Sequence, residues 1–431
     1  MFRHPFLIVL LIAAVSISPR IDIGRLETGR ALQLRYEDFL MVLIFFLWFA
    51  ALSIKNNNIY VSVIASPLII YLVLAAVSTS IGIFAGWVNP VMGFFFYAKE
   101  MQYFFIFFIV LNLLKTYHDL KIAIWALLAC GIANGFYVLY QIFSGQLFAA
   151  SRGYYGISCI GEPSPFATGG YFLIIFIISS AFFFVVHGKI IKLLCGFSAL
   201  LALIGLVGSM SRANIIAATF GIFMLLVFFV IRTERNTKFT FAFVTPIVVI
   251  PLILLIGTTW VCLGQVFPLG RMTVANIRHS FFEKRVRRIY VPAFKEFAKS
   301  PVLGLGKSST TSFIAGTGEA HNYYLRILIE MGIPGLIAFL YLLISIVKMS
   351  LKVYKNSSFE VGKGVGLGCL LVTMSLMVAS TAQDAFTPVK VNEFFWMLAG
   401  LSGVAYRLSS KEKAMQTIEY MGPKTASTFH F

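Results

Sequence analysis

The sequence has few charged residues, and this is its most informative feature. Only 12% of the 431 residues are Asp, Glu, Lys or Arg, whereas soluble domains carry about 25%. Hydrophobic residues make up 59% of the chain, and apolar runs of roughly 20 residues, the length that crosses a bilayer, recur throughout. These features exclude a soluble globular protein. They predict membrane helices, because lipid offers no partners to unpaired backbone groups.

Several sequence motifs are missing as well. The chain has no P-loop, no dinucleotide-binding fingerprint and no H-E-x-x-H motif. Its five cysteines show neither C-x-x-C spacing nor a histidine at metal-ligand spacing. No outward-facing carboxylate cluster resembles an Asp-x-Asp metal site. We therefore expect no cofactor, no metal ion and no structural disulfide.

The apolar runs predict an all-α, polytopic membrane protein with about twelve spans. The first span resembles a signal segment but lacks an A-x-A-like cleavage site, so we expect it to be retained. We divide the chain into 1–262 with nine spans, a long loop 263–321, 322–410 with three spans, and a tail 411–431. The spans are predicted at 5–18, 38–54, 60–85, 91–114, 122–145, 166–186, 190–208, 213–231, 239–262, 322–347, 364–382 and 391–407.

The net charge of +18 reflects topology and gives no reason to expect a nucleic-acid partner. Basic residues such as Lys189, Lys192, Lys352 and Lys355 cluster in short loops on one side, which is the pattern of cytoplasmic loops. Both termini are then cytoplasmic, and the long loop lies outside. The first loop, at about 19–37, contradicts the rule, because four arginines fall on the outer side.

The long loop contains a predicted amphipathic helix, Phe281–Lys299, with apolar residues at helical spacing and a basic opposite face. Such a helix is expected to lie along the membrane surface. Arg285 and Arg288 fall on one side of it and Arg287 roughly opposite. Arginine forks suit a pyrophosphate, and simple attraction to anionic lipid head groups explains the same residues equally well.

Two further candidates lie at predicted outer helix ends. Arg212, in Ser211-Arg212, is a fixed cation suited to a lipid-linked phosphate, or alternatively a topogenic arginine that snorkels to the surface. His321, followed by Asn322, is suited to proton transfer near neutral pH. An ordinary surface histidine is the alternative reading.

Charged residues inside predicted spans are functional candidates because burial in lipid is costly. Arg326 and Glu330 are four residues apart and are expected to pair with each other. The neighbours Lys99 and Glu100 each need a partner on another helix, and Glu393 lies near the last span.

The Gly/Pro-rich segment 151–165 is predicted to be a loop outside the membrane. Its Tyr154, Tyr155 and Glu162 could shape a sugar site, and a plain connector is the alternative.

Three segments together resemble the O-antigen ligase/polymerase family of bacterial polysaccharide assembly. The segment Gly208–Asn214 resembles the family's Ser-Arg signature. The segment from Tyr290 to Gly306 is similar to its aromatic-x-x-Ala start and Pro-x-x-Gly-x-Gly end. His321-Asn322, followed after nine residues by Gly332-Ile333-Pro334-Gly335, is similar to the ligase motif H-[NSQ]-x9-G-x-x-G.

The resemblance implies a GT-C-like, metal-independent, inverting glycosyltransferase that takes a glycan from undecaprenyl-pyrophosphate. Arg212 would hold the pyrophosphate and His321 would be the general base. Arg285 or Arg288 would supply the family's second arginine, with Arg287 still possible. Arg287, Tyr154, Glu162 and Asn322 are the candidate substrate-binding residues.

The acceptor implied is a growing glycan or a lipid A-core, so polymerase and ligase remain alternatives, as do exopolysaccharide and lipopolysaccharide products. The implied location is the bacterial inner membrane, with the site facing the periplasm and lipids around it. A polysaccharide or small-anion transporter is the alternative from another functional class. Transporters commonly show inverted repeats and broken midplane helices, and inspection of this sequence reveals neither.

Overall fold

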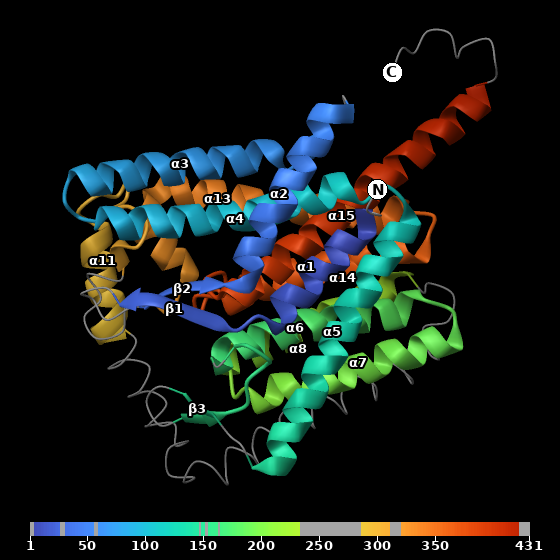
Figure 1. Cartoon of the computed structure of the whole chain (residues 1–431), viewed down its shortest axis with the longest axis horizontal. Coiled ribbons are helices and arrows are strands. Elements are labelled where there is room, and N and C mark those ends of the chain that lie inside the picture. The colour runs from blue at the N-terminus through green and yellow to red at the C-terminus, as the bar shows by residue number, and fades with distance from the viewer. Residues whose placement is uncertain are drawn as a thin grey trace.

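The structure is a bundle of long helices (Figure 1). This computed structural model describes residues 4–25, 31–55, 59–145, 148–150, 154–162, 164–232, 286–310 and 320–421. The helices are α1 (His4–Ile17), α2 (Tyr36–Lys55), α3 (Ala65–Phe84), α4 (Pro90–Leu113), α5 (Tyr117–Ser144), α6 (Pro165–Val185), α7 (Lys189–Gly208), α8 (Arg212–Arg232), α11 (Val291–Phe297), α13 (Tyr323–Asn356), α14 (Glu360–Ala379) and α15 (Val389–Met421).

The predicted helical membrane fold is confirmed. Every predicted span within the described residues coincides with a helix, and the ninth, 239–262, lies outside those residues. Eight of the described helices are long and apolar enough to cross a bilayer. The helix α1 is apolar but has only 14 residues. The chain is therefore a multi-pass membrane protein.

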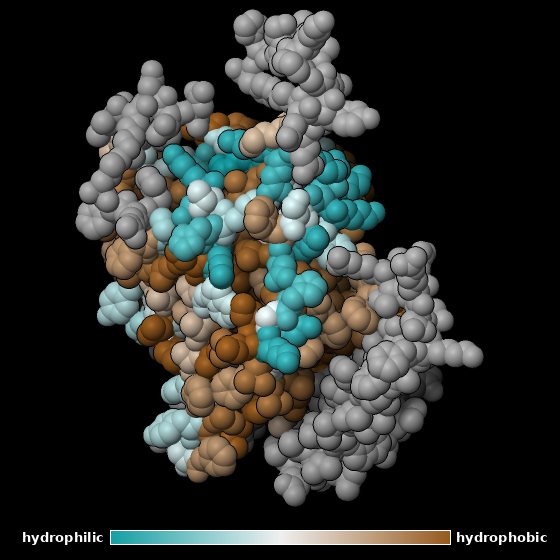
Figure 2. Space-filling model, turned by 90° about the vertical axis from the view of Figure 1, so that its right-hand side faces the viewer, coloured by the Kyte–Doolittle hydropathy of each residue, from teal (hydrophilic) through white to brown (hydrophobic). Residues whose placement is uncertain are grey.

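The bundle has two distinct ends. The start of α1 and the end of α15 lie at one end, on the right of Figure 1, and we call this the termini end. Figure 2 looks at it directly and shows hydrophilic side chains gathered over a largely hydrophobic body. At the opposite end, which we call the loop end, α7 gives way to α8, and α13 begins beside the end of α14.

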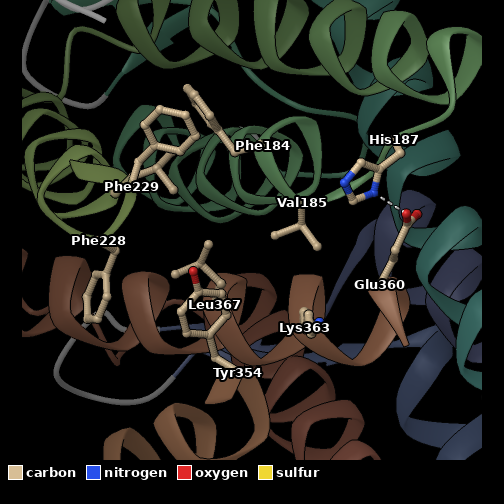
Figure 3. A pocket seen from close by; sticks show the side chains of 10 residues that line it. Phe184, Val185, His187, Phe228, Phe229, Tyr354, Glu360, Lys363 and Leu367 are labelled. Carbon is tan, nitrogen blue, oxygen red and sulfur yellow. Dashed lines mark hydrogen bonds and ion pairs between the residues drawn. The ribbon is translucent and has the colours of Figure 1, made fainter. Parts of the chain in front are cut away.

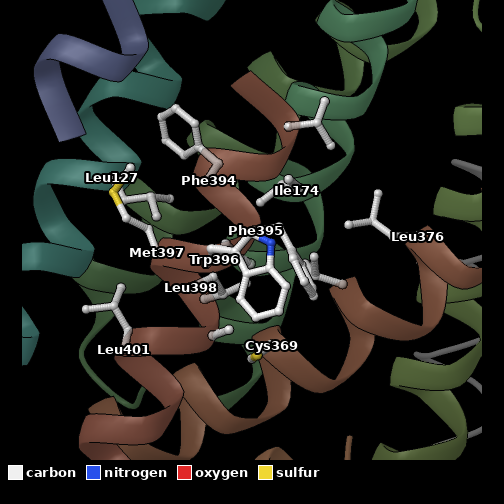
Figure 4. Packing of buried hydrophobic residues seen from close by; sticks show 14 of the residues in the cluster. Leu127, Ile174, Cys369, Leu376, Phe394, Phe395, Trp396, Met397, Leu398 and Leu401 are labelled. Carbon is white, nitrogen blue, oxygen red and sulfur yellow. The ribbon is translucent and has the colours of Figure 1, made fainter. Parts of the chain in front are cut away.

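The core is built around α6 and α14, whose apolar spans are 83% and 72% buried. A run of large side chains on α15, Phe394–Leu398, fills the space beside them (Figure 4). Trp396 packs edge-on against Phe104 of α4, with ring centroids 4.5 Å apart. Because such close packing leaves few alternative arrangements, this core fixes how the helix ends meet at the loop end.

The helix α13 is broken at Gly332, where φ is 68° and ψ is −170°. Only glycine adopts this conformation readily. The break receives the segment 301–306: the Leu305 and Gly306 amides donate to the Ile329 and Glu330 carbonyls at 2.8 and 2.9 Å, and the Ile333 amide donates to Pro301 at 2.9 Å. The Pro-x-x-Gly-x-Gly segment, 301–306, and the G-x-x-G segment, 332–335, therefore meet in one backbone contact.

The predicted amphipathic helix, 281–299, is described from Val286 onward. The backbone is helical from Val286, with a wider π-turn over 286–290 before α11, and residues 281–285 lie outside the described residues. Its apolar residues Ile289 and Ala293 are buried against Leu325 and Ile329 of α13. This apolar face therefore packs on protein, and the position of the helix along the membrane surface stays a prediction.

Two short antiparallel hairpins, both in segments predicted to be loops, complete the described structure. The strand β1 (Arg20–Arg25) pairs with β2 (Ala31–Arg35), and β3 (Phe148–Ala150) pairs with β4 (Tyr154–Gly156). A hairpin satisfies backbone groups locally without a wide sheet, and the pattern of turn residues alone did not reveal the pairing.

Candidate functional site

The Ser211-Arg212 pair forms the start of α8 at the loop end. Met210 takes a left-handed backbone conformation, with φ of 55°, which turns the chain from α7 into α8. Ser211 and Asn214 are buried, whereas Arg212 is exposed. The side-chain amide of Asn214 donates to the Ser211 hydroxyl at 2.8 Å. This hydrogen bond stabilises the first turn of α8, while the Arg212 guanidinium faces outward.

His321 lies two residues before the start of α13 and also has a left-handed backbone, with φ of 49°. A non-glycine residue in this region is strained, and such strain concentrates at functional sites. Asn322 is the N-cap: its side-chain oxygen accepts from the Leu325 amide at 3.1 Å. The candidate substrate-binding residue Asn322 therefore has a structural role that fixes the chain beside the partly buried His321.

The loop between α14 and α15, residues 380–388, contacts both segments. On one side the side-chain amide Nε2 of Gln383 donates to Asn214 Oδ1 at 2.6 Å, and the Ser211 hydroxyl donates to Gln383 Oε1 at 3.3 Å. On the other side the Tyr323 amide donates to the Ser380 carbonyl at 2.9 Å. One loop thus joins the Ser-Arg turn to the segment that carries His321.

A buried ionic network lies behind His321. Arg326 Nε is 3.0 Å from Glu330 Oε1, which confirms the predicted i,i+4 pair. Arg326 also donates to the Thr387 hydroxyl at 3.1 Å and lies 3.7 Å from Asp384. Because breaking one partner of a buried ion pair costs about 3–5 kcal/mol, this network holds the 380–388 loop on α13.

The network continues to α4 through Lys307. Its ammonium lies 2.9 Å from Glu100 and 3.7 Å from Glu330, and it contacts the Tyr71 hydroxyl at 3.2 Å. Glu100 therefore has the partner from another element that the sequence required. Lys307 follows the Pro-x-x-Gly-x-Gly segment directly, so the contact at the α13 break is also held by charge.

A second buried charge cluster lies around β2 and the start of α2. Lys99 pairs with Asp38 of α2 at 2.5 Å, which supplies the partner from another helix that the sequence required. Arg35 lies 2.6 Å from Glu162, so the carboxylate considered for a sugar site is buried and ion-paired. Glu393 is completely buried, and its oxygens have no hydrogen-bond partner among the described residues.

The remaining predicted residues fall into three groups. Arg287 and Arg288 are exposed on the π-turn before α11. Tyr154 and Tyr155 belong to β4, so only their backbone is described. Arg285 lies outside the described residues. Gln383, Asp384 and Lys307 were missed by the sequence reasoning; polar residues in the short 380–388 connection were the available signal for the first two.

The chemistry that this end of the molecule offers is anion binding and proton transfer. Helix N-termini at Arg212 and Tyr323 favour negative charge, and arginine suits phosphate oxygens. Among the described residues no group of three or more His, Cys, Asp or Glu side chains is placed to hold a metal ion.

Helix layout and site define a polytopic membrane protein with a polar, arginine- and histidine-bearing loop end. Residues 197–340 match the model of the O-antigen ligase family, a span that runs from α7 past the α13 break. This match supports the resemblance to the O-antigen ligase/polymerase family and a role in glycan assembly at a membrane. No match was found among curated proteins.

Proposed function

We propose that this protein transfers a glycan from an undecaprenyl-pyrophosphate carrier to a hydroxyl of a sugar acceptor. The observation that carries the proposal is the 380–388 loop, which contacts both the Ser211-Arg212 turn and the start of α13. A glycosyl transfer of this kind needs a group that stabilises the leaving pyrophosphate and a group that accepts the acceptor's proton.

In the proposed reaction the acceptor oxygen forms a bond to the anomeric carbon as the bond from that carbon to the pyrophosphate oxygen breaks. The pyrophosphate leaves with the bonding electrons, and the acceptor proton passes to the imidazole of His321. Arg212 and one of Arg285, Arg287 and Arg288 stabilise the negative charge. Direct displacement inverts the anomeric configuration, and the arginines perform the role that a metal has in other transferases. Activity is therefore expected to persist in a chelator.

The site is proposed to face the periplasm, on the outer side of the cytoplasmic membrane. The charge distribution supports this orientation, because Lys189, Lys192, Lys352 and Lys355 lie near helix ends at the termini end, the side expected to be cytoplasmic. A cysteine introduced at exposed Thr381 should react with an impermeant thiol reagent in intact spheroplasts, and one at exposed Lys355 should not. Labelling of the Lys355 cysteine alone would show that the protein has the opposite orientation.

The central test replaces His321 with Ala and follows glycan transfer in proteoliposomes that contain the lipid-linked donor and an acceptor. Product formation is expected to be abolished while the protein remains inserted and abundant. His118→Ala is the matched control, because His118 is exposed on α5 near the opposite end. Normal product from the His321 variant would refute the assignment, and a transport role would not require the imidazole to act as a base.

Polymerisation and ligation differ only in the acceptor, so a deletion strain distinguishes them. Loss of long chains with attachment intact indicates a polymerase. Long chains that accumulate on the carrier without attachment to lipid A-core indicate a ligase.

A further inference from the structure

A cavity of about 310 Å³ lies at the termini end, far along the helices from the 380–388 loop. It is enclosed by α6, α8, α13 and α14 (Figure 3). Its volume is at the lower limit of small-molecule sites. The inner wall is apolar and is formed by Phe184, Leu225, Phe228, Phe229 and Leu367.

The rim of the cavity carries charges of both signs. His187, in the turn between α6 and α7, pairs with Glu360 at the first residue of α14 (Figure 3). Lys363, one turn further along α14, also lines the cavity and is partly exposed. Among the described residues no acceptor is within reach of its ammonium.

The cavity lies where α6 ends and α14 begins, which is the level of the membrane surface in a helix of this length. Its apolar wall then faces acyl chains and its charged rim faces head groups. A ligand that fits both parts has a hydrocarbon chain joined to a head group with one anion and one cation. A purely anionic head group would face the Glu360 carboxylate, and that contact is unfavourable.

We propose that this cavity binds a zwitterionic aminophospholipid of the leaflet on this side. One acyl chain lies against Phe228 and Leu367, the phosphate pairs with Lys363, and the amine pairs with Glu360. The bound lipid would join the α6–α7 turn to the α13–α14 turn, two connections that are already linked by the His187–Glu360 pair.

The test is native mass spectrometry of the full chain after reconstitution with equimolar phosphatidylethanolamine and phosphatidylglycerol. The wild-type protein should retain phosphatidylethanolamine preferentially. Leu367→Trp, which fills the cavity, should lose most of this lipid. Leu193→Trp is the matched control because Leu193 is 75% exposed on α7 at the same end, and it should bind like the wild type.

A second pair of variants covers the case in which Leu367→Trp does not fold. Lys363→Ala changes a partly exposed side chain and should lower retention roughly tenfold, as expected for loss of a charge-assisted hydrogen bond. Lys352→Ala, an exposed lysine on α13 outside the cavity, should have no effect. Equal retention in both lysine variants, or preferential retention of phosphatidylglycerol, would overturn the proposal.

Discussion

Replacing Gln383 with Ala removes the two hydrogen bonds that tie the 380–388 loop to the Ser211-Arg212 turn. Each such bond contributes about 0.5–1.5 kcal/mol. If the whole loss falls on the transition state, turnover should drop roughly 5- to 150-fold. The turn that carries Arg212 would be less firmly held, so we also expect the KM for the proposed lipid-linked donor to rise.

The assay is initial-rate glycan transfer in proteoliposomes, with the amount of folded protein measured in parallel. Thr381→Ala is the control, because Thr381 is exposed and, among the described residues, its hydroxyl bonds within its own turn, to the Val378 carbonyl. A merely structural defect would lower the active fraction and leave the donor KM unchanged. Activity of the Gln383 variant within twofold of the Thr381 variant would refute the positioning role.

The double variant of Gln383 and Asn214 provides an independent check. Because both residues belong to one hydrogen-bonded group, their effects should not add, and the second Ala should cost little beyond the first. Simple addition of the two losses would mean that each residue acts separately, and the loop would then have no role in coupling the two helices.

Three further predictions concern single groups. Arg212→Lys should lose most transfer activity in the proteoliposome assay, because a point charge cannot fork onto phosphate oxygens; full activity would favour the topogenic explanation. Gly332→Ala should lower stability by about 1–3 kcal/mol in detergent melts, while Gly368→Ala, where the new methyl would lie 3.5 Å from Ile178, should not. Arg35→Met should cost about 3–5 kcal/mol by leaving the Glu162 carboxylate without its arginine, and a mild effect would mean that solvent reaches this cluster.

The helical architecture was predictable because each membrane helix forms its own backbone hydrogen bonds and can be recognised from its apolar composition alone. The pair of Arg326 and Glu330 was predictable for the same reason, since both residues lie on one helix face. For Lys99 the need for a partner was predictable, but its identity as Asp38 was not. That pairing depends on how α2 packs against α4, which no local pattern encodes.

The connections were the least predictable part. Gln383 and Asp384 lie in a short polar turn whose composition is ordinary. Their importance comes from contacts with distant residues: Gln383 contacts Asn214, 169 positions earlier in the chain, and Asp384 contacts Arg326, 58 positions earlier. The family motifs identified where Arg212 and His321 lie in the chain. The motifs did not reveal that the Pro-x-x-Gly-x-Gly segment fits the break at Gly332, because that contact joins two pieces of backbone.

The positions of the charges suggest how one end of an apolar bundle can be both rigid and reactive. Lys307 and Glu330 are buried, Glu100 is partly buried, and both carboxylates pair with the Lys307 ammonium. Moving any of the three would leave an uncompensated charge in a poorly solvated interior. Arg212 and Arg288 are exposed. The buried charges therefore fix the geometry of the helix ends, and the exposed arginines can exchange water for phosphate without disturbing it. The proposed lipid-linked donor would need this division, because its binding groups must be open to the membrane surface while the buried charges that support them stay closed to it.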